Sequence, residues 1–137
     1  MHCHLDDGST FKIFSFADLV SFAELAKLST RPTSELYMYV TTDSGTFAIK
    51  INDREKLKKK LTSLNEISYI LYDRTFSSYV KNTDDLETQT KGFLKFLKNT
   101  PGLENPGIDL YRKYDNNQWK KLALSPNNIV IDPTNCN

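Results

Sequence analysis

The chain is poor in residues that mark several classes of protein. It has 137 residues, of which only two are cysteine and one is tryptophan, so at most one intramolecular disulfide can form. No apolar run approaches the roughly 18 residues of a membrane span, and no basic segment followed by an apolar one opens the chain. We therefore expect no membrane partner. The default location is cytoplasmic, or secreted if the chain belongs to a longer exported protein.

Charge of one sign is also lacking. Eighteen basic and seventeen acidic side chains give a net charge of +1, which supplies no field that would attract nucleic acid. What is present is a content of 39% hydrophobic and 12% aromatic residues, typical of a folded chain with a real core. We expect one domain over 1–137, without nucleic acid as a partner. Oligomeric state is left open.

The two cysteines lie almost at opposite ends, at Cys3 and Cys136. If the protein is exported, a disulfide between them could join the termini, whereas free thiols are the cytosolic norm. Cys3 has a third possible role as a soft zinc ligand.

The first half of the sequence predicts a helix and a β-hairpin. Ser15 followed by Asp18 fits a capping box, with a buried helix to follow over Phe16–Leu28. Alternating side chains then predict a strand over Leu36–Thr41, a turn at Asp43–Gly45 and a second strand over Thr46–Ile51.

The second half predicts further helices and then strands. We expect helices over Asp53–Leu64, capped by Asn52 with Glu55, and from Asp84 and Asp85 to Thr100. The stretch Glu66–Lys81 favours a strand by residue type and a helix by spacing, and we interpret it as a helix. Strands are expected over Ile108–Tyr114, Gln118–Leu124 and Ile129–Ile131. The predicted class is α+β: an amino-terminal buried helix, a β-hairpin, two to three helices and carboxy-terminal antiparallel strands.

The chemistry of the chain is concentrated at its start. The sequence has no Gly-rich phosphate loop, no Gly-x-Ser-x-Gly elbow and no Cys-x-x-Cys pair. His2 and His4 are its two histidines, and imidazoles two residues apart on an extended segment point the same way. A carboxylate from the first helical turn, Asp18, could be a third ligand to a zinc ion, with a fourth position open for water.

These residues resemble the motif of the JAB/MPN, or JAMM, metalloprotease-like domains, which is His-x-His, usually followed by Pro, then seven residues and Ser-x-x-Asp. His2-Cys3-His4 and Ser15-Phe16-Ala17-Asp18 match its two halves. Here ten residues separate the halves, and Leu5 replaces the proline. The resemblance covers about the first 50 residues. The chain is also similar to carboxy-terminal regions of Bacteroidetes proteins with such a start, which implies no function.

The resemblance implies that His2, His4 and Asp18 bind Zn²⁺ and that Ser15 stabilises the intermediate as water attacks a peptide or isopeptide carbonyl. The family also uses a glutamate upstream of the histidines, and only Met1 precedes His2 here. We therefore expect a metallopeptidase-type domain that is inactive as written, completed by an upstream glutamate if the chain is the carboxy-terminal part of a longer JAB-like protein.

Simpler interpretations stand beside this one. The first four residues could be a terminal tail without a role, and Ser15 with Asp18 could be a helix cap alone. Lys56, Lys58, Lys59 and Lys60 fit a solvated helix face. The tyrosines and Trp119 fit the rim of the core. The alternative function is a non-enzymatic interaction module or a carboxy-terminal domain of a larger secreted or toxin-associated protein.

Overall fold

The computed structural model describes residues 2–3, 11–127 and 130–136, with the backbone alone at 2–3 and 130–136. The helices are α1 (Phe16–Leu28), α2 (Arg54–Leu61), α3 (Glu66–Tyr79) and α4 (Leu86–Asn99), with a short 3-10 turn η1 (Thr33–Glu35). The strands are β1 (His2–Cys3), β2 (Tyr37–Thr42), β3 (Gly45–Ile51), β4 (Ile108–Lys113), β5 (Trp119–Leu124) and β6 (Val130–Cys136). The predicted α+β class, with an amino-terminal helix and carboxy-terminal strands, is confirmed.

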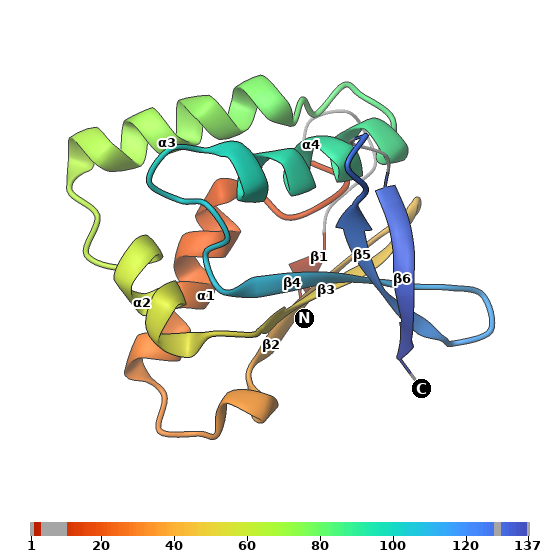
Figure 1. Ribbon diagram of the computed structural model, residues 1–137, viewed down its shortest axis with the longest axis horizontal. Helices are drawn as coiled ribbons and strands as arrows, with labels where there is room; N and C mark the ends of the chain where they lie inside the picture. The colour runs from red at the N-terminus through yellow and green to blue at the C-terminus, as the bar shows by residue number, and fades with distance from the viewer. Residues whose placement is uncertain (1, 4–10, 128–129, 137) are drawn as a thin grey trace.

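The six strands form one sheet in the order of the chain, β1-β2-β3-β4-β5-β6. β2 to β6 pair antiparallel with their neighbours, whereas β1 pairs with β2 in parallel. The helices gather on one side of this sheet, with α3 and α4 beside each other (Figure 1). Among the described residues, no helix has the length and apolar character that crossing a membrane requires.

The core lies between the helices and one face of the sheet. Val40, Phe47 and Ile49 point into it and are fully buried, because alternate side chains of a strand share a face. Phenylalanine rings from the helices meet them, and the rings of Phe76 and Phe96 make an edge-to-face contact with centroids 5.1 Å apart. The predicted helix over Glu66–Lys81 is confirmed as α3. Its tyrosines and Phe76 pack against the core along one side of the helix.

The carboxyl end of α1 is held by an arginine from α2. The Arg54 guanidinium donates hydrogen bonds to the carbonyl oxygens of Ala26 at 2.9 Å, Ser29 at 2.7 Å and Arg31 at 2.7 Å. These carbonyls belong to the last turn of the helix and the segment after it, where no intrahelical donors remain. Arg54 thus fixes α2 against α1.

Three predicted boundaries were wrong. The residue that caps α2 is Asp53, whose Oδ1 accepts from the Lys56 N–H at 3.1 Å, whereas the Asn52 side chain donates to Asp109 at 2.9 Å. α2 ends at Leu61 rather than Leu64, because Thr62 is its C-cap and Ser63 takes a left-handed φ of 59°. β6 extends to Cys136 and contains Pro133, which an edge strand tolerates.

The two cysteines lie in the first and last strands of the sheet order, Cys3 in β1 and Cys136 in β6. Their side chains fall outside the described residues. The possible disulfide between them therefore stays a prediction.

Candidate functional site

Ser15 and Asp18 are brought together at the start of α1 and form the predicted capping box. The Ser15 Oγ accepts from the Asp18 N–H at 3.1 Å, and the Asp18 Oδ2 accepts from the Ser15 N–H at 2.8 Å. Ser15 has an extended backbone, with φ −87° and ψ 170°, as an N-cap residue requires. Both side chains therefore have a structural role at this position.

The carboxylate of Asp18 lies close to polar groups of α3. Burial raises the pKa of the Tyr69 phenol, and the carboxylates of Asp73 and Asp18 raise it further, because they disfavour a phenolate beside them. Asp18 thus acts electrostatically on α3 as well as capping α1.

The histidine half of the predicted site is described only in part. His2 lies in β1 opposite Val40 of β2, and Cys3 lies opposite Thr41. The backbone at His2 is extended, as predicted, while its side chain and all of His4 fall outside the described residues. The distance from the imidazoles to Asp18 therefore stays a prediction.

The strand that carries His2 and the helix that begins after Ser15 belong to one connection of the chain. β1 and β2 are parallel and adjacent, and α1 lies between them in the chain (Figure 1). Residues 4–10, which follow β1, fall outside the described residues. The approach of the histidines to Ser15 and Asp18 therefore stays a prediction.

Within the side chains that the structure describes, no group of three or more His, Cys, Asp or Glu residues could hold a metal ion. Asp18 with Asp73 alone supplies only carboxylates. A zinc site at Asp18 therefore depends on the histidines.

Comparison with known proteins adds no relative. A scan of protein-family models, a search of curated proteins and a search of solved structures each found no match. The JAB/MPN resemblance thus rests on the motif residues alone.

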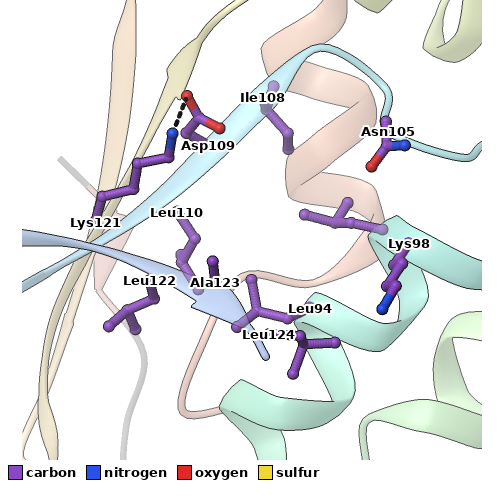
Figure 2. A pocket seen from close by; sticks show the side chains of 11 residues that line it. Leu94, Lys98, Asn105, Ile108, Asp109, Leu110, Lys121, Leu122, Ala123 and Leu124 are labelled. Atoms are coloured by element: carbon purple, nitrogen blue, oxygen red, sulfur yellow. Dashed lines mark ion pairs between the residues drawn. The ribbon is translucent and has the colours of Figure 1, made fainter. Parts of the chain in front are cut away.

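A cleft of about 370 Å³ lies between α4 and the β4–β5 part of the sheet (Figure 2). Its walls are mainly leucine and isoleucine side chains: Leu94, Leu97, Ile108, Leu110, Leu122 and Leu124. At its rim, Lys121 forms an ion pair with Asp109 at 3.7 Å. The described lining has no histidine, cysteine or serine, so this cleft offers contact surface without a nucleophile.

The sheet face opposite the helices carries an aromatic group that the sequence reasoning assigned to the core rim. The rings of Tyr37 and Tyr39 stack with centroids 6.1 Å apart, and the pairing register puts Tyr111 and Trp119 on the same face. No described helix covers it. The alternation of Tyr37 and Tyr39 with buried residues was the signal in the sequence, but which face the helices cover was not readable there.

The lysine run of α2 is less exposed than the solvated helix face that the sequence predicts. Lys59 is exposed, whereas Lys56, Lys58 and Lys60 are half-buried. Lys58 pairs with Glu55 of its own helix at 2.8 Å, and Lys60 donates to the Glu104 carbonyl oxygen at 2.7 Å. These contacts hold the lysine stems along the protein surface.

Proposed function

We propose that this chain is a zinc-binding domain of the JAB/MPN-like metallopeptidase type, in which His2, His4 and Asp18 bind the ion. The observation that supports it is the element order: an extended backbone at His2, then the Ser15–Asp18 capping box at the start of α1, then a strand parallel to the first, which is the order the motif resemblance implies. Two imidazoles and one carboxylate are a ligand set used by catalytic zinc sites.

The capping role of Asp18 is compatible with metal binding. A carboxylate has two oxygens and about four acceptor positions, and the cap uses Oδ2 for one hydrogen bond. The cap also fixes the side-chain direction, as the partners of a metal ligand commonly do.

Zinc, when bound, polarises a carbonyl group and lowers the pKa of bound water to about 7. Ser15 would act as a hydrogen-bond donor to the oxygen of a peptide or isopeptide substrate, since a hydroxyl that accepts from the Asp18 amide can still donate its own proton. Neither group moves a proton from water to a leaving amine, a step that peptide hydrolysis requires. The proposal is therefore metal binding by these residues, without turnover by them alone.

The test is a calorimetric titration of chelator-treated protein with Zn²⁺. We expect one site per chain in the parent and none in the His2→Ala, His4→Ala double variant. Glu24→Gln is the matched control, because it removes an acid of the same helix that is not a predicted ligand, and it should titrate like the parent. Cys3→Ala tests whether the thiolate is the fourth ligand. Equal zinc binding by the double variant and the parent would dismiss the site.

A non-enzymatic interaction module is the second candidate, favoured by the uncovered sheet face with Tyr37, Tyr39, Tyr111 and Trp119. Tyr37 is exposed and the other three are half-buried, and aromatic side chains are enriched at protein interfaces. The zinc titration separates the zinc-binding domain from the interaction module, because a parent protein that binds no zinc would favour the module.

A further inference from the structure

Helix α3 is apolar on two opposite sides. Its inward side contributes Tyr69, Tyr72 and Phe76 to the core. On its outward side Ile67, Ile70 and Leu71 are exposed by 72%, 46% and 53%. The spacing of these three residues places them on one stripe of the helix.

This outward stripe is unusual for the molecule. Of the six large hydrophobic side chains that the described residues expose, three belong to it. Single exposed apolar residues are normal at a protein surface, whereas a contiguous group marks an interaction site. We call Ile67, Ile70 and Leu71, together with Glu66 and Arg74 beside them, the outer α3 face.

The charges at its two ends are opposite in sign. Glu66 is in the first turn of α3 and Arg74 lies eight residues further on, or about 12 Å along the axis. Both are exposed, and neither has an ion-pair partner within the residues that the structure describes. The midpoint between them is Ile70, at the centre of the apolar stripe.

We propose that the outer α3 face pairs with the same face of a second copy, with the two helices antiparallel and the two-fold axis beside Ile70. In that arrangement Glu66 of each copy lies opposite Arg74 of the other, and Ile67 and Leu71 pack on either side of the axis. A parallel pair would set each arginine beside its equivalent, which like-charge repulsion disfavours. The face is thus self-complementary in the antiparallel sense, as a two-fold interface must be.

The contact is small. α3 has 14 residues and is about 21 Å long, so one helix pair buries less surface than a standard stable interface. We therefore expect association that depends on concentration rather than a permanent dimer. The contact does not involve the proposed zinc ligands, so it is independent of the metal.

The test is sedimentation equilibrium over micromolar to millimolar concentrations, in buffer with a chelator so that zinc cannot bridge molecules. The parent should move from monomer to dimer across this range. Ile70→Lys places like charges at the axis and should remain monomeric, while Leu28→Lys, at a 77% exposed leucine of α1, should associate like the parent. Circular dichroism of both variants checks that they remain folded.

A charge-exchange experiment tests the antiparallel geometry. Arg74→Glu and Glu66→Arg each create two like-charge contacts in a homodimer, so each variant alone should stay monomeric. Mixed together, they restore both opposite-charge contacts and should form a heterodimer. A parent that is monomeric at every concentration would overturn the proposal, and so would an Ile70→Lys variant that dimerises as the parent does. Failure of the mixture to associate would overturn the antiparallel pairing. None of these outcomes bears on the zinc titration.

Discussion

Replacing Asp18 by Asn separates the two roles that the structure and the motif give to this residue. In the cap, the Asp18 Oδ2 accepts one hydrogen bond from the Ser15 N–H at 2.8 Å, and the amide oxygen of Asn can accept the same bond. The loss is then the favourable interaction of a negative charge with the helix amino terminus, about 0.5 kcal/mol. As a zinc ligand, by contrast, a neutral amide is a poor substitute for a carboxylate. Since loss of a ligand's hydrogen-bond partner alone costs 10–100-fold in metal affinity, we expect Asp18→Asn to weaken zinc binding by more than about 100-fold.

Ser15→Ala is the complementary variant. It removes the hydroxyl that accepts from the Asp18 N–H at 3.1 Å, and loss of an N-cap side chain costs about 1 kcal/mol of stability. The variant keeps the backbone N–H that donates to the Asp18 Oδ2, and Ser15 is not a proposed zinc ligand, so most of the zinc affinity should remain. The two variants therefore predict opposite patterns: Asp18→Asn keeps the fold and loses the metal, whereas Ser15→Ala loses part of the stability and keeps the metal.

The assay is urea unfolding followed by circular dichroism, first with a chelator and then with zinc. At a free zinc concentration 100 times Kd, binding stabilises the native state by about 2.7 kcal/mol. The parent and Ser15→Ala should both gain this amount, and Asp18→Asn at the same zinc concentration should gain little. An equal gain in all three proteins would show that Asp18 serves the cap alone.

Three further predictions concern the fold that supports the site. Gly92→Ala should lower the free energy of unfolding by about 3 kcal/mol in urea titration, because an added Cβ would overlap the Tyr79 carbonyl where α3 meets α4; an unchanged midpoint would contradict that close approach. Arg54→Met should cost about 3 kcal/mol, since it removes the charged donors to the end of α1, whereas a cost under about 0.5 kcal/mol would show that water replaces them. Hydrogen bonds from the Thr88 side chain and then its backbone hold the pKa of Asp85 below its ordinary value of 3.8. The stabilisation by this carboxylate is thus present above about pH 4 and lost as the pH falls through its lowered pKa. Asp85→Asn should therefore flatten this part of the plot of unfolding free energy against pH. Identical plots for the variant and the parent would show that Asp85 does not contribute to acid unfolding.

Local features of the fold could be predicted from the sequence because each depends on a few neighbouring residues. The capping box of Ser15 with Asp18 is such a feature, and so is the hairpin turn at Asp43 and Ser44. The Asn52 cap was misplaced by one residue, since Asp53 fits the same spacing and Asn52 instead reaches Asp109 across the sheet.

Features that depend on distant pairing could not be predicted. The edge position of β6 is what permits Pro133 in a strand, and the order of the sheet puts Cys3 and Cys136 in its first and last strands. Neither is visible in local periodicity. The spacing of the residues in the outer α3 face predicted a helix but not that this side of the helix is exposed. A helix that is apolar on two sides can bury either one, and tertiary packing decides which.

Of the candidate site, the capping box of Ser15 and Asp18 is confirmed, whereas the role of either residue at a metal ion stays a prediction. Their convergence with His2 and His4 stays a prediction. It depends on a backbone bend between β1 and α1, which residue spacing alone does not determine.

The most direct measurement is a crystal structure of the zinc-loaded protein with anomalous data collected at the zinc absorption edge. We expect one zinc peak, with a nitrogen of His2, a nitrogen of His4 and a carboxylate oxygen of Asp18 each at about 2.0–2.2 Å. A zinc peak elsewhere on the molecule, or imidazoles that turn away from Asp18, would contradict the proposed metal site.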